Sequence, residues 1–458
     1  MQPRFEDYQQ HIAQLVQAAL TAVNPQTAVS RHLKRTGRRL TIGSGNNAST
    51  FDLDHGRLYL VSVGKAAVPM AKAVLELLAD AIEGAVIVPK KGERNWATEL
   101  GDWVLGERLR LFPAAHPVSD ADSVAAATLV FDLLAKTTKN DLVLFLISGG
   151  ASALLTRPLL ALGDWQRLTD VLLASGCSIQ ELNTVRRHLD EVKGGGLARA
   201  AAPSACISLI LSDVVGNPLG AIGSGPTVLA SDSPADALNI LQRYGVPEKM
   251  ETAVWRRILL SLHRANNQHE TQLWPAVNRH TIVGDVRQAA TAAMLRAVQL
   301  GFVSDMLTTH LEGEAREVGR VAAAIARDAQ PGCCRILGGE TTVTLRGKGI
   351  GGRNQEVALA AAIALSGKPR TVLASVATDG DDGPTGAAGA VVTGETAVFA
   401  RQNQLDPATY LDNNDSHTFF TRFDSHHLSG HPAQTLIKTG QTGTNVNDLI
   451  IILTYDQP

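Results

Sequence analysis

The stretch LYLVSVGKAAVPMAKAVLELLADA (residues 58–81) decides the fold class of this chain. A short apolar run rich in β-branched residues passes through Gly64 and Lys65 into an Ala- and Leu-rich run with helical spacing, which is the pattern of a strand, a turn and a helix. Comparable apolar runs recur at GAVIVPK (84–90), DLVLFLISGG (141–150), CISLILSDVVG (206–216), TIVGD (281–285), GFVSDMLT (301–308), RILGGETTVTLRG (335–347, two strands with a turn), TVLASVATDG (371–380) and DLIIILTY (448–455). Strands that alternate with helices predict an α/β protein with largely parallel sheets.

Length and composition limit the possible classes of protein. The 458 residues, 45% of them hydrophobic, suffice for two or three domains with large cores, and we place a domain boundary in the irregular segment 232–280. A net charge of −2 gives no basic field for nucleic acid. The N-terminal residues are not typical of a signal peptide, and no run of about 18 apolar residues could span a membrane. Four cysteines without a CxxC pair indicate reduced thiols, so we expect a cytoplasmic protein.

The most glycine-rich stretch, GKGIGGRNQEVA (347–358), matches the dinucleotide-binding pattern GxGxxG and precedes a helical run. The preceding TTVTL (341–345) reads as a strand, which is the required context. Two details argue against a dinucleotide site. The acidic residue Asp379 follows Gly352 by 27 positions instead of about 20. Arg353, Asn354 and Gln355 also follow the last glycine directly, where the packing of helix on strand favours small apolar groups. Arg353 at a helix start is disfavoured by the dipole, and a bound anion would explain it. A flexible hairpin and a loop that places an anion beside Arg353 are the other interpretations.

Two further strand-to-helix turns have residues suited to anions. Lys65 follows Gly64 at the end of a strand, where open α/β sheets place their ligands, although a solvated lysine is the simpler explanation for a single residue. Ser148-Gly149-Gly150-Ala151-Ser152 offers backbone N–H groups and two hydroxyls. A serine N-cap explains this turn equally well.

Acidic and glycine-rich loops follow other predicted strands. Asp213 is suited to bind Mg²⁺ or to accept a hydroxyl proton, or simply to cap its turn. Glu340 and the loop beginning at Asp379 resemble metal or sugar-hydroxyl sites, with ordinary acidic turns as the alternative. Asn183 and Arg186 share a helix face, and the helix ends at Lys193-Gly194-Gly195-Gly196, either a C-cap or a phosphate loop.

Several motifs are missing from the sequence. No GxxxxGK[ST] occurs, so the chain is not a P-loop nucleotide hydrolase, and neither a GxSxG elbow nor a protein-kinase motif set is present. His417 and the cluster His426, His427 and His431 lack metal-ligand spacing, and we interpret them as structural or surface residues.

Seven motifs in order resemble the class II glycerate 2-kinases, the family whose C-terminal part is called the MOFRL domain. They are VGKAA (63–67), SGGASALL (148–155), LNTVRRHLDEVKGGGLA (182–198), SDVVGNPLGAIGSGPT (212–227), GGETTVTLRGKGIGGRNQE (338–356), ATDGDDGPTGAAGA (377–390) and TGTNVNDL (442–449). The resemblance covers nearly the whole chain. It departs at Gln441, where proline is expected, and at His417, where an aromatic residue is usual.

The resemblance implies a fold and an activity. We expect an N-terminal Rossmann-like three-layer domain with a mostly parallel sheet (1–255) and a C-terminal α/β domain with a mixed sheet (256–458), the MOFRL region at about 333–450 and an active-site cleft between them. The implied reaction is ATP-dependent phosphorylation of the 2-hydroxyl of D-glycerate, with Mg²⁺, to 2-phosphoglycerate. Partners are therefore a small substrate and a nucleotide, without nucleic acid or membrane, and a homodimer is expected.

The resemblance also implies the site. Lys65, Asp213 and Arg353 are the expected catalytic residues, and Asp213 and Asp379 are expected to bind the metal. We expect the Ser148–Ser152 turn and Lys193–Gly196 to hold nucleotide phosphates, and Asp213 to orient or deprotonate the substrate hydroxyl. The full set expected to bind substrate or nucleotide is Gly64, Ser148, Gly149, Gly150, Ser152, Asn183, Arg186, Lys193, Gly194, Gly195, Asn217, Glu340, Gly351, Gly352, Asn354 and Asp379.

Two other functions remain open from the sequence. A hydroxypyruvate reductase using NAD(P)H is supported by the literal GxGxxG and by the name of some family members. The sequence shows no obvious acid–base histidine that would act with an arginine to polarise the carbonyl. A non-catalytic sugar-acid-binding module has little use for so many glycine turns and acidic loops.

Overall fold

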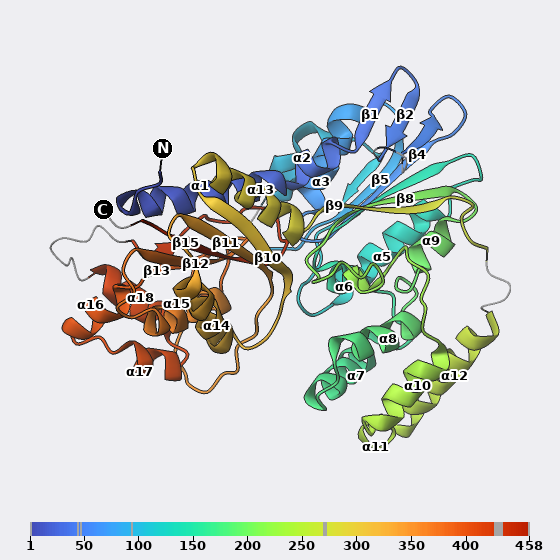
Figure 1. The fold of residues 1–458 in the computed structure, drawn as a ribbon. Helices are drawn as coiled ribbons and strands as arrows, with labels where there is room; N and C mark the ends of the chain where they lie inside the picture. The colour runs from blue at the N-terminus through green and yellow to red at the C-terminus, as the bar shows by residue number, and fades with distance from the viewer. Residues whose placement is uncertain are drawn as a thin grey trace. The chain divides into compact units, whose positions relative to one another are not determined.

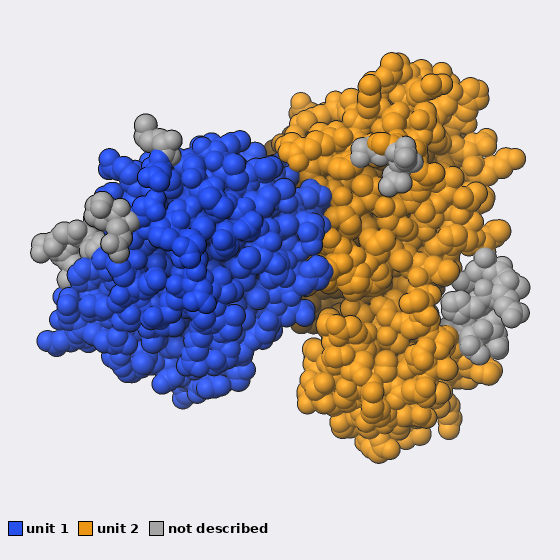
Figure 2. Space-filling view, in the orientation of Figure 1, with its two compact units in different colours: residues 1–24, 284–458 blue, residues 25–283 orange. Residues whose placement is uncertain are grey.

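The computed structural model describes residues 2–43, 45, 48–92, 95–268, 273–425 and 434–456. His426, His427 and His431 lie outside the described residues. The chain forms two compact units, here called unit 1 (residues 1–24 and 284–458) and unit 2 (residues 25–283), as Figure 2 shows.

The centre of unit 2 is a six-stranded sheet in the order β6-β5-β4-β7-β8-β9. Its strands are β4 (Leu58–Val63), β5 (Ile82–Val88), β6 (Leu109–Leu111), β7 (Leu142–Ile147), β8 (Ala205–Leu211) and β9 (Asn278–Gly284). All neighbouring pairs from β6 to β8 are parallel. Every residue of β4 and β7 is buried, because helices cover both faces of the sheet.

Side chains alternate between the two faces of this sheet. Tyr59, Val61 and Val63 of β4 pack in one core with residues of α5 (Ala121–Leu134), α6 (Ala151–Leu154) and α9 (Gly196–Ala201). Helix α3 (Ala67–Leu78) contacts β4 and β5 and, with α2 (Pro25–Ser30), lies on the opposite side from α5 (Figure 1). The predicted three-layer α/β arrangement with a mostly parallel sheet is confirmed.

Two smaller parts complete unit 2. Strands β1 (Leu33–Thr36), β2 (Arg39–Ile42) and β3 (Ser49–Asp52) form an antiparallel sheet that the apolar pattern did not predict. A helical lobe with its own apolar core contains α7 (Leu162–Ala174), α8 (Ile179–Leu189), α10 (Pro234–Arg243), α11 (Val246–Lys249) and α12 (Thr252–Gln268) (Figure 1). Unit 2 also contains three short elements: helix α4 (Trp96–Leu100) and the 3-10 turns η3 (Gly101–Leu105) and η4 (Ile222–Ser224).

Unit 1 contains a mixed six-stranded sheet in the order β10-β11-β15-β12-β13-β14. Strands β10 (Val303–Leu311) and β11 (Cys333–Gly339) pair in parallel, whereas the pairs made by β12 (Thr371–Ala377), β13 (Gly389–Thr393), β14 (Leu436–Ile437) and β15 (Asp448–Thr454) are antiparallel. The predicted mixed sheet is confirmed.

The helices of unit 1 are α1 (Tyr8–Ala22), α13 (Val286–Gln299), α14 (Ala315–Asp328), α15 (Arg353–Ala364), α16 (Thr396–Gln402), α17 (Pro407–Asp412) and α18 (Ser416–Ser425), with the short turn η1 (Phe5–Asp7). Helices α14 and α15 pack so closely that a Cβ on Gly319 would lie 2.4 Å from the Val357 carbonyl oxygen. Helix α1 packs against α13, so the first 24 residues belong to unit 1 and not to the domain of residues 1–255 expected from the sequence.

One predicted strand is wrong. Residues 341–345 (TTVTL) form only an isolated bridge between Thr342 and Glu314, and the chain from the end of β11 to α15 is irregular.

Among the described residues, no helix combines the length and the apolar character needed to cross a bilayer.

Candidate active site

The turns after β4 and β7 meet at the carboxyl edge of the unit 2 sheet. The Lys65 N–H donates to the Gly149 carbonyl (2.8 Å), and the Ala66 N–H donates to the buried Ser148 hydroxyl oxygen (3.0 Å). Because the two strands are parallel neighbours, their turns necessarily lie at the same edge. The structure therefore brings together Gly64, Lys65, Ser148 and Gly149, which the sequence had placed at separate motifs.

Glycine is required at these turns because other groups occupy the space of a side chain. A Cβ on Gly64 would lie 2.1 Å from the Ser148 hydroxyl oxygen, and Gly64 also has a φ of +128°. A Cβ on Gly149 would lie 1.9 Å from Oδ2 of Asp213. Asp213 follows β8, so the predicted catalytic carboxylate rests directly on the backbone of the Gly149 turn.

The same turn contacts a residue that sequence reasoning missed. A Cβ on Gly150 would lie 3.0 Å from Cδ2 of His116 and 3.5 Å from Cγ of Lys65. Burial, and then the charges of Lys65 and Lys90, lower the pKa of His116 to about 4. The available signal was its place in a loop after a short strand, β6, which ends at the same edge of the sheet.

The glycine triplet after α8 has a structural role that differs from the predicted phosphate contact. The ammonium group of Lys193 is fully buried and donates to the carbonyls of Ser152 (2.9 Å) and Leu155 (2.5 Å), and burial lowers its pKa to about 8. The N–H groups of Gly194 and Gly195 donate to the carbonyls of Ser224 and Gly225. These donors are therefore engaged within the fold, and we interpret the triplet as the support of the loop after β8.

The remaining predicted residues of unit 2 surround that loop. Asn183 is buried and accepts a hydrogen bond from the Ser224 hydroxyl (2.7 Å), while Asn217 has a φ of +55° in the loop itself. The half-buried guanidinium of Arg186 has its pKa lowered by burial, and it forms no hydrogen bond with any residue that the structure describes. Of these three residues, Arg186 is the best candidate to bind an anion.

In unit 1, the glycine-rich loop is held by the segment that joins α17 and α18. The N–H groups of Arg346 and Gly347 donate to Oδ1 of Asn414, and the N–H of Gly349 donates to the Asn413 carbonyl. The N–H of Ile350 donates to the Asp415 carboxylate, and the Ile350 carbonyl accepts from His417. The backbone N–H groups of residues 346–350 are therefore engaged by protein atoms.

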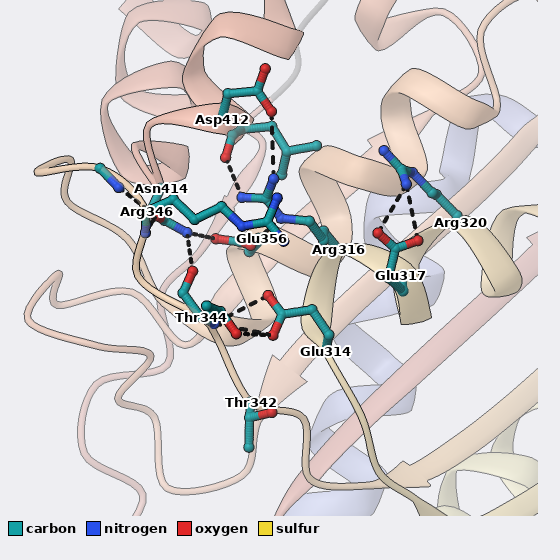
Figure 3. A network of polar contacts seen from close by, with 12 residues as sticks. Glu314, Arg316, Glu317, Arg320, Thr342, Thr344, Arg346, Glu356, Asp412 and Asn414 are labelled. Atoms are coloured by element: carbon teal, nitrogen blue, oxygen red, sulfur yellow. Dashed lines mark hydrogen bonds and ion pairs between the residues drawn. The ribbon is translucent and has the colours of Figure 1, made fainter.

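A buried ion pair supports Asn414, the residue that holds this loop. Figure 3 shows Asn414 between the Thr344 carbonyl, the N–H of Arg346 and the Glu356 carboxylate. Glu356 in turn pairs with Arg316 (3.2 Å), and both side chains are 3% exposed, so this charge pair is shielded from water. The network fixes the path of the chain into α15.

Replacing Gly349 by alanine should destabilise the protein by about 3 kcal/mol. The new Cβ would lie 2.3 Å from Cβ of Asp415 and 2.6 Å from the Asn413 carbonyl oxygen, so the loop or its support must move. Gly163→Ala in α7 is the control, because a Cβ there meets open space. Urea unfolding followed by circular dichroism measures both, and equal stability of the two variants would contradict this account.

The carboxylate of Asp382 accepts hydrogen bonds from the N-terminus of α15. The N–H groups of Asn354 and Gln355 donate to the two oxygens of the buried Asp382 carboxylate, each at 2.9 Å. A Cβ on Gly352 would lie 2.3 Å from Cγ of Asp382, so a larger residue does not fit at position 352. The expected anion beside this helix start is thus a carboxylate of the chain, and Gly351 and Gly352 serve close packing. A Cβ on Gly351 would similarly lie 2.3 Å from the Ser416 hydroxyl oxygen.

Arg353 lies between two further carboxylates. Its Nε and Nη2 donate to the two Asp448 oxygens (2.6 and 3.0 Å), and its Nη1 lies 2.7 Å from Glu340. Burial raises the pKa of Asp448 to about 6, although Arg353 lowers it. Burial disfavours the charge of Arg353, but the hydrogen bond to Asp448 and nearby acids raise its pKa above the ordinary value. The guanidinium is therefore fixed, charged and still about 30% exposed.

The predicted metal ligands lie in different units. Asp213 belongs to unit 2, whereas Asp379 belongs to unit 1, where its carboxylate accepts from the Asp381 N–H (3.1 Å). In the part of the chain that the structure describes, no group of three or more His, Cys, Asp or Glu side chains is arranged to hold a metal ion. A cation that binds through one or two carboxylates together with substrate phosphates is compatible with either residue.

An open α/β sheet with a lysine, a carboxylate and close-packed glycine turns at its carboxyl edge is typical of an enzyme that binds small anionic ligands. Comparison with known proteins narrows this class. Residues 11–259 match the family described as a domain of unknown function, DUF4147, and residues 333–448 match the MOFRL family.

The similarity to individual proteins extends over nearly the full length. The D-glycerate 2-kinase of Thermotoga maritima is 39% identical over 447 residues, which cover 96% of each chain. The glycerate 2-kinase of Pyrococcus horikoshii is 35% identical over 450 residues, again 96% of each chain. A crystal structure of the Thermotoga maritima glycerate kinase has a TM-score of 0.81 at 37% identity and covers 98% of this chain and 100% of that one. The chain belongs to the MOFRL-containing glycerate kinase family.

Proposed function

We propose that this protein is a glycerate 2-kinase, which transfers the γ-phosphoryl group of ATP to the 2-hydroxyl of D-glycerate and releases 2-phosphoglycerate and ADP. The observation that carries the proposal is the 39% identity to a D-glycerate 2-kinase over 96% of both chains. The protein is then a phosphotransferase with an alcohol group as acceptor, and we keep a cytoplasmic location and a homodimer as predictions.

Lys65 and Asp213, at the carboxyl edge of the unit 2 sheet, are suited to phosphoryl transfer. This chemistry requires mainly positioning and positive charge near the oxygens of the transferred group. We assign Lys65 to that charge, because it follows β4 and its backbone is tied to the Gly149 turn. Asp213 rests on the same turn and is assigned to orient the acceptor or to hold Mg²⁺. Bound Mg²⁺ supplies further charge to the nucleotide phosphates, and Asp379 is the second candidate to hold it.

Arg353 is assigned to bind the substrate carboxylate or the transferred phosphoryl group. A guanidinium has five N–H donors. Asp448 accepts hydrogen bonds from Nε and Nη2, and Glu340 pairs with Nη1. Each of the two Nη atoms has a second N–H, so N–H donors remain for a ligand. The two carboxylates fix the plane of the guanidinium, and a preorganised donor stabilises a transition state without the cost of reorganising it.

The reductase alternative has little support. Its only sequence signal was the GxGxxG of residues 347–352. The backbone N–H groups of its first four residues bind Asn413, Asn414 and Asp415. The strand that should precede such a fingerprint is absent from residues 341–345, all of which the structure describes.

The decisive experiment supplies the purified protein with D-glycerate, ATP and Mg²⁺, coupled through enolase and pyruvate kinase without phosphoglycerate mutase. Pyruvate forms only if the product is 2-phosphoglycerate, so its appearance establishes both the reaction and the position. ADP release without pyruvate would indicate a different acceptor hydroxyl or ATP hydrolysis. NAD(P)H oxidation by hydroxypyruvate without ADP release would favour the reductase and contradict the proposal.

A further inference from the structure

We propose that His116 is a catalytic residue of this reaction, the general base that accepts the proton of the 2-hydroxyl of the acceptor. The inference rests on the proposed function and deepens it, because it assigns the proton transfer to a side chain that none of the quoted motifs contains. Four observations carry it: the place of His116, its lack of a partner, the charges around it and the groups that it faces.

His116 lies at the edge of the sheet where Lys65 and Asp213 lie. Its ring contacts Gly150, at 3.0 Å (Cδ2) and 3.2 Å (Nε2) from the position of a Cβ there, and the next residue back, Gly149, contacts Asp213. The aliphatic part of Lys65 contacts the same side of Gly150. The imidazole, the ammonium-bearing side chain and the carboxylate thus surround two consecutive glycines of one turn.

His116 also differs from the other histidines that the structure describes. Those with a buried or half-buried side chain each have a hydrogen-bond partner: His11 has Tyr455, His32 has Ala28, His188 has Asp232, His280 has Thr227 and His417 has Gln355. The half-buried ring of His116 has none among the described residues. The ring is only half-buried, and its nitrogens are not among the enclosed side-chain atoms that lack a partner, so water or a ligand can reach them. We infer that the ligand is the acceptor.

The surroundings of the imidazole keep it in its basic form. Burial disfavours its protonation most, and the charges of Lys65 and Lys90 act in the same direction to lower its pKa. The ring therefore has a free lone pair at neutral pH, as a general base requires. Asp213, whose carboxylate contacts Gly149, is the acidic side chain of the same turn.

The step balances as follows. The 2-hydroxyl proton of D-glycerate moves to Nε2 of His116 as the hydroxyl oxygen forms a bond to the γ-phosphorus of ATP. The bond from that phosphorus to the β,γ-bridging oxygen breaks, and ADP leaves with the electron pair. The charges of Lys65 and Lys90 disfavour the imidazolium, so it loses its proton to solvent before the next turnover.

The test compares the wild-type protein with His116→Gln, which keeps a polar group of similar length but cannot accept the proton. We expect kcat to fall about 100-fold with KM for D-glycerate changed less than about threefold, which is within the usual contribution of a general base. The acid-side loss of kcat in the wild-type pH profile should disappear in the variant. His280→Gln, at another half-buried histidine of unit 2, should retain wild-type kinetics.

A His116→Gln variant with more than about one third of the wild-type kcat and an unchanged acid limb would overturn this assignment alone. If that variant does not fold, His116→Ala with added imidazole replaces it. Partial recovery of kcat by imidazole supports proton transfer, and no recovery overturns it. A wild-type protein that forms no 2-phosphoglycerate would overturn the proposed function and this assignment together.

Discussion

Replacing Lys65 by alanine is expected to lower kcat/KM for phosphoryl transfer about 100- to 1,000-fold, the usual effect of removing one preorganised charged donor. The ammonium group is the positive charge that unit 2 contributes at the turn after β4, and an uncharged side chain cannot replace it at the transferred phosphoryl group. The coupled assay with D-glycerate and ATP measures this loss. The fold should persist, because the backbone contact of residue 65 with Gly149 does not involve the side chain.

Lys72→Ala is the matched control for this experiment. Lys72 lies on α3, the helix that follows the same turn, and its removal changes the net charge of the protein equally. Lys72 is half-buried and lies away from the strand-end turns, so we expect its kcat/KM to remain within about twofold of the wild type. Equal losses in both variants would show that the effect of Lys65 is one of general charge and would exclude the assigned role.

Replacing Arg353 by methionine is expected to impair both activity and folding. We expect a loss of at least about 2 kcal/mol in transition-state stabilisation. The free energy of unfolding should also fall by about 2–4 kcal/mol, because the change leaves the buried Asp448 carboxylate without its partner. This range begins below the value of about 3–5 kcal/mol for fully buried pairs, since about 30% of the Arg353 side chain is exposed. Urea unfolding and the coupled assay separate the two effects.

The double variant Arg353→Met/Asp448→Asn tests the cause of that instability. Without the buried carboxylate, most of the lost stability should return, while kcat/KM should remain low. Recovery of activity along with stability would mean that Arg353 supports the fold and does not act on the substrate. A double variant no more stable than Arg353→Met would contradict the proposed pairing with Asp448.

The same pair predicts a pH dependence. The folded pKa of Asp448 is raised to about 6, above its value of 3.8 in the free side chain, so the folded protein holds this proton more strongly than the unfolded chain. The contribution of Asp448 to stability is therefore present below about pH 4 and is lost as the pH rises through about 6. In Arg353→Met the pKa should rise further, so the deficit against the wild type should grow from pH 5 to pH 8. A constant deficit over this range would contradict the argument.

Much of the fold followed from local patterns. The central strands β4, β7 and β15 were predictable because each is a continuous apolar run between turn residues. The short strands β6 and β14 were missed, since three or two residues carry too little periodicity. The false strand at 341–345 has alternating β-formers, but its N–H groups bind other elements, as with Thr344 and Glu314.

The candidate site was predictable only in part. Lys65, Ser148, Gly149 and Asp213 each follow a predicted strand, and the carboxyl ends of parallel strands lie at one edge of the sheet. Which of these turns are neighbours depends on the strand order, which the sequence did not show. His116 could not be assigned to this edge, because its loop follows a three-residue strand and enters the site through contacts with residues more than 30 positions away. Lys193 was misjudged for a similar reason: nothing local shows that its ammonium group is buried against two carbonyls.

The sequence by itself determined the α/β class, the family and the positions of the glycine turns, because these depend on residue types at short spacing. Only the tertiary structure decided what those glycines contact. The loop at 347–352 closes on residues 413–416, and α15 receives the Asp382 carboxylate at its N-terminus. Helix α1 packs on α13, more than 260 residues further along the chain, and not in the unit formed by the residues that follow it. These contacts join residues far apart in the chain, where the burial of apolar surface and the pairing of buried polar groups, not local preference, set the structure.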